Sequence, residues 1–505
     1  MEPAGEGGAA VSGSWIAGMR SVRTLAGRGS NVRGILFNLA GAAAPAALAL
    51  LCIPWIASTL GAARFGVLAL AWTAIGYVAF LHLGLGRAVA RGTAAGGDAE
   101  GDELRATVWT ALGMTLALGA LGGALLFAFA AGVVRLLHMP AALAAEATAA
   151  VRILACAVPF TVTTPVLSGV LEARRRFGVV NAVTVPSALV TYLGPVAALA
   201  VSHTLVPLVA VLAVGRVLSW AAFFVLCLRE VPELRGGPTF HGRLARPLLS
   251  YGGWTTVSAL VSPLLVYMDR FVIGAAVSAA AVAYYATAQE VVLRTGLVSG
   301  AVVGVLFPAF ASVPEHDGRR LARLLESGVD AVLVLVLPLA LVLAAAAEPL
   351  LRFWLGGDYA DQGAHVLAWL SFGLVVNGLA KVASTMLQAV GRPDLTARLH
   401  LMELPGFVLV LGVLVWAWGL EGAAVAWVVR VTADSAGLYW FAWRRVPETR
   451  SAAMRAAWVT ACAAAGVGAL RLASSPLARA ALLAVAAVAL LWAFGRILHR
   501  RAATS

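Results

Sequence analysis

The sequence predicts an all-α polytopic membrane protein with about fourteen transmembrane helices, arranged as two parallel six-helix repeats followed by two C-terminal helices. Its composition, its long apolar segments and its arginine distribution support this prediction. Hydrophobic residues make up 61% of the 505 residues, charged residues make up 12%, and the mean hydropathy is +0.89. A soluble globular chain of this length needs far more polar surface than this composition supplies.

Fourteen apolar segments are each long enough to cross the hydrocarbon core of a bilayer, which takes about 20 helical residues. They are rich in alanine and lack the strict alternation of a transmembrane β-barrel, so we expect helices. The predicted spans are 35–58, 66–86, 106–133, 147–170, 179–201, 205–228, 249–275, 280–310, 327–347, 364–389, 399–418, 421–443, 453–472 and 477–497.

The arginines orient these spans. If the N-terminus is cytoplasmic, the inner segments hold twenty-six arginines and the outer segments hold five. Cytoplasmic loops carry such an excess of basic residues, so we expect a multi-pass protein of the cell (inner, cytoplasmic) membrane with both termini in the cytoplasm. The net charge of +13 then reflects topology and contact with membrane lipids. Because no soluble basic domain exists, we expect no nucleic-acid partner.

The chain also carries an internal duplication. Adding 216 to the midpoints of the first six spans gives, within a few residues, the midpoints of spans seven to twelve. Because each unit has an even number of spans, the two halves should share one orientation and be related by an axis along the membrane normal. The predicted divisions are a cytoplasmic basic tail (1–30), an N-terminal six-helix bundle (31–228), a cytoplasmic linker (229–247), a C-terminal six-helix bundle (248–447), and two additional helices with a cytoplasmic tail (448–505).

Ionisable residues at membrane depth are costly and usually face water or each other, so they are candidate functional residues. Those within the predicted spans are Arg152, Arg216, Asp269, Arg270, Glu290, Arg294, Lys381, Glu403, Arg430 and Asp434. The i, i+4 spacings of Glu290 with Arg294 and of Arg430 with Asp434 equally allow structural ion pairs. Lys381 has no acid one turn away on its helix, which favours a ligand-facing role.

Polar side chains form stripes on four spans, at spacings that place each set on one helix face. The stripes are Thr255, Ser258, Ser262 and Asp269; Asn377, Lys381, Ser384 and Gln388; Thr161, Thr164, Ser168 and Glu172; and Tyr284, Thr287, Glu290 and Arg294. Together they indicate a hydrated path between the halves. A structural alternative is that the serine and threonine hydroxyls bond to their own helix backbone or join helices.

Enzymatic and metal-binding motifs are missing from the sequence. It contains no nucleophile elbow, P-loop, dinucleotide fingerprint or zincin motif. The four cysteines lie in apolar stretches without zinc-site spacing. We therefore expect neither an enzyme nor a metal site.

Several stretches resemble the multidrug/oligosaccharidyl-lipid/polysaccharide flippase superfamily, specifically its polysaccharide-transporter branch of the Wzx type. The resemblance covers roughly residues 30–447. The stretches that carry it are Leu81 to Gly86, Ser168 to Ala173 with Phe177 and Asn181, Tyr267 to Arg270 with Gly274, Tyr284-Tyr285, Pro308 to Phe310, and Pro349 to Gly356. His82 departs from the pattern, since relatives often have an acid there.

The resemblance implies a flippase that moves an isoprenoid-pyrophosphate-linked oligosaccharide from the inner to the outer leaflet by alternating access, with spans one, two, seven and eight around the central opening. A pyrophosphate needs cationic partners. The expected substrate-binding residues are Lys381, Arg294, Arg216, Asn377 and Arg270, and the expected coupling or gating residues are Asp269, Glu290 and Asp434. We expect no cofactor apart from a coupling ion, Na⁺ or H⁺. The expected partners are the lipid-linked glycan and a polysaccharide polymerase or glycosyltransferases.

Two other functions fit the same fold. One is a cation-coupled multidrug exporter, which should carry acids in its upper cavity, commonly in its first span. Residues 35–58 contain none, which favours an anionic substrate. The other is a flippase for lipid II-type peptidoglycan precursors, since those proteins also have two extra terminal spans.

Overall fold

The protein is an all-α polytopic membrane protein, as predicted. A computed structural model describes residues 30–80, 100–137, 140–174, 176–243, 261, 264–314, 317–473, 475 and 477–488. Within these residues the chain forms helices and no strands. Ten of the described helices are long and apolar enough to cross a membrane.

The elements follow the predicted spans closely. In chain order the helices are α2 (Ser30–Phe80), α4 (Glu100–Leu136), α5 (Ala141–Ala173), α6 (Phe177–Leu199), α7 (Leu205–Glu230), α9 (Ala279–Thr295), α10 (Leu297–Ala311), α11 (Gly318–Ala331), α12 (Leu337–Ala345), α13 (Ala347–Leu355), α14 (Gly357–Ala389), α15 (Pro393–Arg445) and α16 (Arg450–Leu472). Residues 264–276 and 477–488 are also helical.

Two long helices are each bent at a glycine that falls between two predicted spans. Gly61 in α2 has φ 74° and ψ 162°, and Gly419 in α15 has φ 56° and ψ −128°. Only glycine adopts such positive φ values at low cost. The bends divide α2 and α15 into two arms each, where the sequence predicted outer loops. The total of fourteen spans stays a prediction, because parts of spans seven and fourteen lie outside the described residues.

The ninth predicted span differs most from the structure. Its helix starts at Gly318 rather than at 327, since the Asp317 side chain caps it by accepting a hydrogen bond of 3.0 Å from the Arg320 backbone amide. The stretch Val332–Val336 is a π-helical turn that joins α11 to α12. The short helix α13, which the hydropathy pattern did not predict, then precedes α14.

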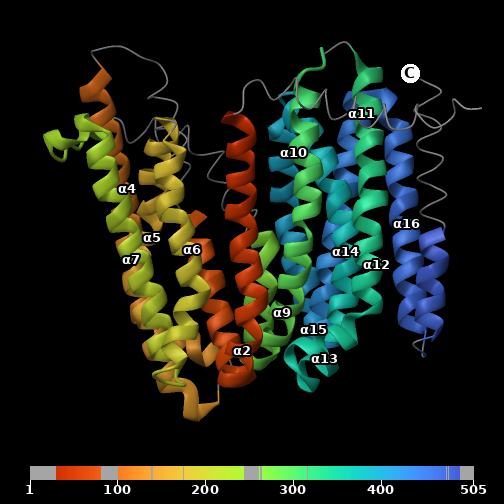
Figure 1. The fold of residues 1–505 in the computed structure, drawn as a ribbon, viewed down its shortest axis with the longest axis horizontal. Helices are drawn as coiled ribbons and strands as arrows, with labels where there is room; N and C mark the ends of the chain where they lie inside the picture. The colour runs from red at the N-terminus through yellow and green to blue at the C-terminus, as the bar shows by residue number, and fades with distance from the viewer. Residues whose placement is uncertain are drawn as a thin grey trace, which may run out of the picture.

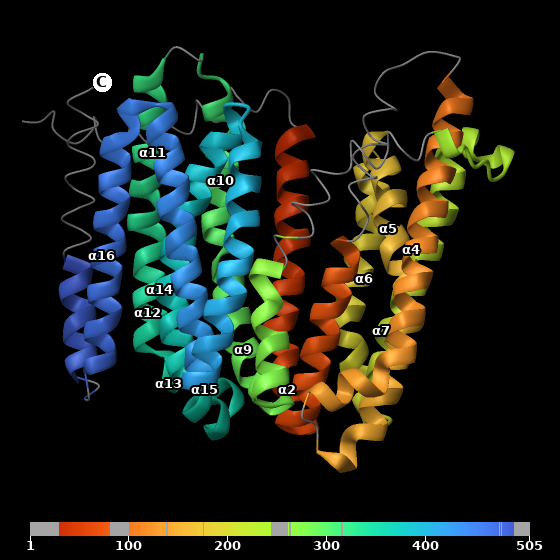
Figure 2. The ribbon, with the colours of Figure 1, turned by 180° about the vertical axis from the view of Figure 1, so that it is seen from behind.

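The helices pack into two groups, shown from opposite sides in Figures 1 and 2. Helices α4, α5, α6 and α7 pack together and against α2, while α9 to α16 pack around α14. Helix α2 lies between the groups and contacts α9 and α13. We call α2–α7 the N-terminal half and 264–472 the C-terminal half. The predicted domain boundaries and the rotational relation of the halves stay predictions.

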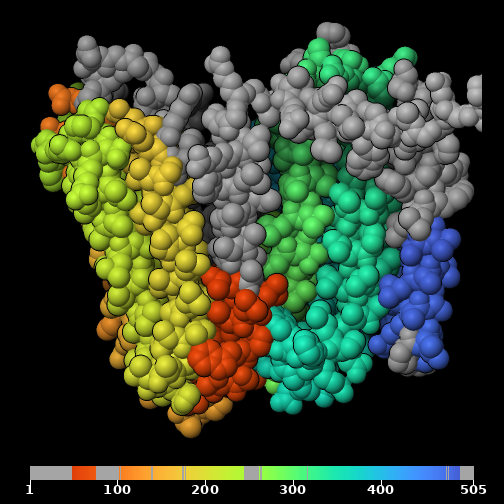
Figure 3. All heavy atoms as spheres, in the orientation of Figure 1, coloured from red at the N-terminus to blue at the C-terminus, as the bar shows by residue number. Residues whose placement is uncertain are grey.

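The halves meet closely at the end of the molecule that was predicted to face outward. A Cβ atom added to Gly66 of α2 would lie 1.7 Å from the Ala279 carbonyl oxygen of α9, so only glycine fits this contact. The Trp354 indole nitrogen of α13 donates a 2.8 Å hydrogen bond to the Leu50 carbonyl of α2. In Figure 3 this part of α2 forms the red surface between the two halves.

Polar contacts attach the connecting segments to each half. After α7, a 3-10 turn at Pro232–Gly236 packs on α4, where Arg105 Nε donates 2.9 Å to the Gly237 carbonyl. Helix α16 is held to the C-terminal half by Arg455, whose Nη1 lies 3.0 Å from Asp330 Oδ1, and by the Arg471–Glu421 ion pair. Helix α16 is therefore part of the C-terminal half in this structure.

Some sequence-based predictions lie outside the described residues. They are the basic tail up to residue 29, His82, and the residues Thr255, Ser258 and Ser262 of one polar stripe.

Candidate functional site

A cavity of about 200 Å³ lies between the two halves. It is lined by both arms of α2, by α6 and α7, by the 264–276 segment and by α9. These elements include spans one, two, seven and eight, which the resemblance placed around the central opening. We call it the central cavity.

Arg270 closes one side of the central cavity and joins the two halves. Its guanidinium donates to Thr73 Oγ1 of α2 at 3.0 Å, to Gln289 Oε1 of α9 at 2.6 Å and to Glu290 Oε1 at 3.1 Å. The side chain is only 4% exposed. Arg270 lines the cavity, but its guanidinium already binds protein groups on all three nitrogens, so a new ligand has to compete with them.

Asp269, next to it in sequence, is fully buried among donors. Its Oδ2 accepts hydrogen bonds from the Tyr285 hydroxyl at 2.6 Å and from Gln289 Nε2 at 2.9 Å. Its Oδ1 accepts one from the Arg270 backbone amide at 2.8 Å. Because a buried carboxylate is stabilised mainly by such donors, this arrangement fixes the helix 264–276 against α9.

A second bridge between the halves runs through Arg294. Its Nη2 lies 3.1 Å from Glu290 Oε2, one turn away on α9, so the structural ion pair predicted as an alternative does form. The same Nη2 donates a 2.8 Å hydrogen bond to the Tyr192 hydroxyl of α6. Glu290 thus receives both arginines, and each arginine also contacts the N-terminal half.

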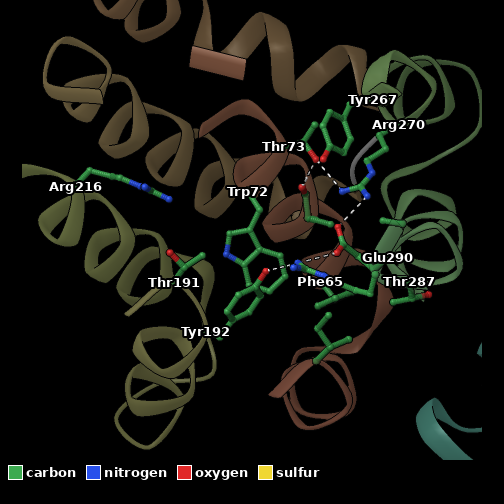
Figure 4. A pocket seen from close by; sticks show the side chains of 14 residues that line it. Phe65, Trp72, Thr73, Thr191, Tyr192, Arg216, Tyr267, Arg270, Thr287 and Glu290 are labelled. Carbon is green, nitrogen blue, oxygen red and sulfur yellow. Dashed lines mark hydrogen bonds and ion pairs between the residues drawn. The ribbon is translucent and has the colours of Figure 1, made fainter. Parts of the chain in front are cut away.

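Arg216 differs from these residues because its charge has no bonded partner among the residues that the structure describes. It reaches into the central cavity from α7, on the side opposite Arg270 (Figure 4). Its guanidinium makes no hydrogen bond or ion pair with the described part of the chain, and its polar neighbour is the Tyr192 hydroxyl. An uncompensated cation at this depth costs at least about 2.5 kcal/mol on insertion scales, so water or an anion must offset it.

Arg216 also lines a second cavity, of about 470 Å³, inside the N-terminal half between α5, α6 and α7. Tyr192 and Thr191 line both cavities, so the two are neighbours. We call the second one the hydroxyl chamber, because its lining hydroxyl groups belong to Thr161, Thr164, Ser168, Thr184, Ser187, Thr191, Tyr192 and Ser219.

All four residues of the span-four stripe, Thr161, Thr164, Ser168 and Glu172, line the hydroxyl chamber, so they share one helix face as their spacing predicted. The chamber lies inside the N-terminal half, whereas the stripes were expected to line a path between the halves. The structural alternative is also correct in part. Thr164 Oγ1 donates to the Phe160 carbonyl at 2.7 Å, and Thr161 Oγ1 donates to the Ala157 carbonyl at 2.9 Å. Each hydroxyl oxygen nevertheless keeps acceptor capacity toward the cavity.

The stripe on α14 is separate from both cavities. Helix α14 is largely buried, yet Lys381 and Gln388 are exposed, and Asn377 is half-buried on the same face. The Lys381 ammonium makes no hydrogen bond or ion pair with any described residue. Lys381 thus has no acidic partner in the described part of the chain, but it lines neither cavity. The role of Lys381 and Asn377 in substrate binding stays a prediction.

Asp434 lies in a buried charge cluster of α15. Its Oδ1 is 3.4 Å from His400 Nε2, whereas Arg430 Nη1 is 3.9 Å from Glu403 Oε2. The i, i+4 ion pair between Arg430 and Asp434 does not form within 4.0 Å. Both basic groups therefore have their nearest acid on the opposite arm of the bent helix.

Sequence reasoning missed several partners of the charged residues, among them Thr73, Tyr192 and Gln289. Tyr192 and Thr73 come from spans that carry no acid or base near them. Gln289 could have been noticed, since it follows Tyr285 by one helical turn and both side chains point at Asp269. Among the described residues no group of histidine, cysteine, aspartate and glutamate could hold a metal ion.

Long apolar helices in two groups, with polar cavities inside and between them, define a polytopic membrane protein of transporter architecture. The chain belongs to the polysaccharide biosynthesis protein family, whose profile matches residues 55–363. A Shigella flexneri protein whose name assigns it to O-antigen transport is 28% identical over 414 residues, which covers 81% of this chain and 97% of that protein. A Haloferax volcanii protein named for a low-salt glycan biosynthesis flippase is 24% identical over 190 residues, 37% of this chain and 40% of that protein.

Solved structures with the same fold include two members of the wider superfamily. The lipid II flippase MurJ, in an inward closed conformation, superposes with a TM-score of 0.72 at 13% identity, covering 92% of this chain and 99% of that one. An inward-facing multidrug resistance MATE family transporter of the MOP superfamily superposes with a TM-score of 0.63 at 15% identity, covering 80% and 96%. These similarities establish the fold. The substrate has to be inferred from the residues of the site.

Proposed function

We propose that this protein is a flippase that moves an isoprenoid-pyrophosphate-linked oligosaccharide from the inner to the outer leaflet for surface polysaccharide export. The family match over residues 55–363 and the named O-antigen transporter relative support the substrate class. Transport of this kind needs no chemical step at the protein, in line with the sequence, which carries no catalytic motif.

The observation that carries the proposal is Arg216, which lines both cavities and is unpaired within the described part of the chain. A pyrophosphate is a multivalent anion with several acceptor oxygens, and the planar guanidinium group binds such oxygens in pairs. At this position Arg216 offers a charge that no described protein group neutralises. The same charge would repel a cationic drug, which is the substrate expected of a multidrug exporter.

The hydroxyl chamber provides the matching site for the glycan. Its threonine and serine oxygens are spaced along α5 and α6, and a sugar hydroxyl can donate to each of them. In this proposal the sugars nearest the pyrophosphate occupy the chamber, Arg216 holds the pyrophosphate, and the isoprenoid tail stays in the bilayer.

Alternating access would proceed by breaking the contacts between the halves. The bridges from Arg270 to Thr73 and from Arg294 to Tyr192 lie beside the central cavity. An anion in the cavity would draw the two guanidinium groups away from the Thr73 and Tyr192 hydroxyls, because a hydrogen bond between two charged groups is stronger than one to a neutral hydroxyl. Loading of the substrate would thereby loosen the interface between the halves.

The proposal also specifies the membrane in which the protein lies, its topology and its partner proteins. The protein would lie in the cytoplasmic membrane with both termini in the cytoplasm, and its substrate would come from glycosyltransferases and pass to a polysaccharide polymerase. Asp269, Glu290 and Asp434 remain candidates for coupling or gating, with Na⁺ or H⁺ as the coupling ion.

Reconstitution into liposomes tests the proposal directly. The probe is a fluorescent isoprenoid-pyrophosphate oligosaccharide placed in one leaflet, and its appearance in the other leaflet is followed by accessibility to a membrane-impermeant quencher. We expect transfer that depends on the protein and is blocked by unlabelled substrate. No transfer of this probe, together with transport of a cationic dye, would replace the flippase with an exporter.

A further inference from the structure

Two buried carboxyl groups of the C-terminal half face each other across the bend of α15. Glu403 precedes Gly419 and Asp434 follows it, each by roughly 23 Å of helix at about 1.5 Å per residue. The bend therefore brings them to the same depth, and the two carboxyl groups lie within hydrogen-bonding reach of each other. Each side chain is only 9% exposed.

Glu403 and Asp434 cannot form a hydrogen bond with each other when both are ionised. Both Glu403 oxygens and Asp434 Oδ1 are buried without a hydrogen-bond partner among the described residues. An ionised carboxylate only accepts hydrogen bonds, so a second carboxylate offers it nothing. A single proton changes this, because it turns one oxygen into a donor and removes one of two adjacent like charges.

Among the described residues, the buried positive charge beside the pair is that of Arg430, which is enough for one carboxylate. Its Nη1 is 3.9 Å from Glu403 Oε2, beyond hydrogen-bond range. Its Nε is also buried and has no hydrogen-bond partner in the described part of the chain, so the guanidinium is not saturated. With one proton on the pair, the two acids and Arg430 sum to zero charge.

Among the other ionisable groups of α14, α15 and α16, His400 competes with the pair for the proton. His400 Nε2 lies 3.4 Å from Asp434 Oδ1 and is the alternative proton carrier. Arg455 of α16 binds Asp330. Lys381, the cation of α14 in this part of the membrane, makes no ion pair with a described residue.

Arg430 also interacts electrostatically with Asp269 and with Tyr285. Asp269 belongs to the network that positions Arg270, and Arg270 in turn binds Thr73 of the other half. A change of charge at the carboxyl pair therefore reaches the interface between the halves through one arginine and one short network.

We propose that Glu403 and Asp434 form a proton-binding site that holds one shared proton, and that release and uptake of this proton is the coupling step of transport. The coupling part rests on the flippase function proposed above; the proton site does not. On release the proton goes to water and leaves two carboxylates, which pull Arg430 toward them and away from Asp269. On uptake the pair again needs only one positive charge.

Infrared spectroscopy of the purified full-length protein tests the site without any substrate. The carbonyl stretch of a protonated carboxyl group is separate from the carboxylate bands, and the difference between the wild type and Glu403→Gln isolates this pair. We expect a protonated-carboxyl band at neutral pH that titrates away at higher pH and is absent in both Glu403→Gln and Asp434→Asn. The matched control is Glu421→Gln, on the same helix, whose carboxylate binds Arg471 and Trp369; it should keep the band.

Two results would overturn the proton site: no titrating protonated-carboxyl band in the wild type, as expected if the proton is on the His400 imidazole, or an unchanged band in both variants. Glu403→Gln should fold, since its amide can donate to Asp434 as the protonated acid does.

The coupling step is tested in the liposome assay. Glu403→Gln should make the flipping rate independent of pH, while Glu421→Gln should keep the pH dependence of the wild type. A pH dependence that survives in Glu403→Gln would overturn the coupling step. A wild type that flips nothing would count against the flippase function and leave the infrared result standing.

Discussion

The two halves of the molecule treat charge around the central cavity in opposite ways. In the N-terminal half, Arg216 projects into two cavities without a bonded partner among the described residues, and its polar neighbour is the Tyr192 hydroxyl. In the C-terminal half, Asp269, Arg270 and Glu290 are bound to one another and to neighbouring side chains. The first arrangement is suited to an external anion, and the second to holding helices in a defined state that a change of charge can switch.

The cost of burial explains why this difference is informative. A charge inside a membrane helix costs at least about 2.5 kcal/mol, and a protein group that offsets this cost is visible in the structure. Arg270 has three such groups, whereas Arg216 has none among the described residues. Its charge is therefore kept for water or a ligand, while the buried networks of the other half stabilise the fold and its conformational states.

The largest expected effect is that of Arg216→Ala. Loss of a hydrogen-bonded charge from the binding site removes about 1.5 to 3 kcal/mol of interaction, so the flipping rate in liposomes should fall on the order of 10- to 100-fold. Arg152→Ala is the matched control. Arg152 is also an arginine within a span of the N-terminal half, but it stacks on Phe127 at 5.3 Å and lines neither cavity. Equal losses in the two variants would contradict the special role of Arg216.

Lys381→Ala tests whether the exposed stripe of the C-terminal half also meets the substrate. We expect glycan export to fall about tenfold with unchanged membrane abundance, since one charged contact is worth roughly 1.5 kcal/mol. Lys381→Arg should keep part of the activity because the charge remains. Normal export by Lys381→Ala in cells would confine substrate recognition to the N-terminal half.

Tyr192→Phe should shift the balance between conformations by a smaller amount. It removes the 2.8 Å hydrogen bond from Arg294 that joins the halves, worth about 1 kcal/mol, so the population ratio should change roughly fivefold. Spin labels at the exposed residues Val201 and Phe353, one on each half, report the distance between the outer ends. Tyr439→Phe serves as the control, because the Tyr439 hydroxyl has no hydrogen-bond partner among the described residues; an equal shift there would contradict the bridge.

The smallest expected effect belongs to the hydroxyl chamber. Thr164→Val removes one sugar-facing hydroxyl without changing the shape of the side chain, and the preference between glycans that differ in one hydroxyl should change a few-fold. Thr148→Val, on the same helix, removes a hydroxyl that bonds to the Ala144 carbonyl and lines neither cavity. If the preference between these glycans changes in neither variant, the hydroxyl chamber does not bind the sugar.

The fold could be predicted from the sequence because two local properties determine a membrane helix. One is the hydropathy of the segment, and the other is the need of its backbone N–H and C=O groups to form hydrogen bonds within the same helix. The breaks near 61 and 419 were placed correctly, although the structure makes them with single glycine bends inside continuous helices. Helix α13 was missed because a nine-residue amphipathic helix is too short to stand out in a hydropathy pattern.

The site could be predicted only in part. The free-energy cost of a charge at membrane depth is a property of each residue alone, and it singled out Arg216, Arg294 and Glu290, which line the central cavity. Their roles in binding and gating stay predictions. Their partners depend on contacts between helices far apart in sequence, so Tyr192 was not predicted. The approach of Glu403 to Asp434 was accessible, since both stand at nearly equal distances from the predicted break at 419.

Direct binding tests the central claim, that Arg216 holds the pyrophosphate of a lipid-linked glycan. The measurement compares the affinity of the purified protein for an isoprenoid pyrophosphate with its affinity for the alcohol of the same isoprenoid, in wild type, Arg216→Ala and Arg152→Ala. The wild type and Arg152→Ala should bind the pyrophosphate at least about tenfold more tightly, from roughly 1.5 kcal/mol of charged hydrogen bonding, and Arg216→Ala should lose this difference. Equal affinity for the two lipids in the wild type, or a difference that survives in Arg216→Ala, would contradict it.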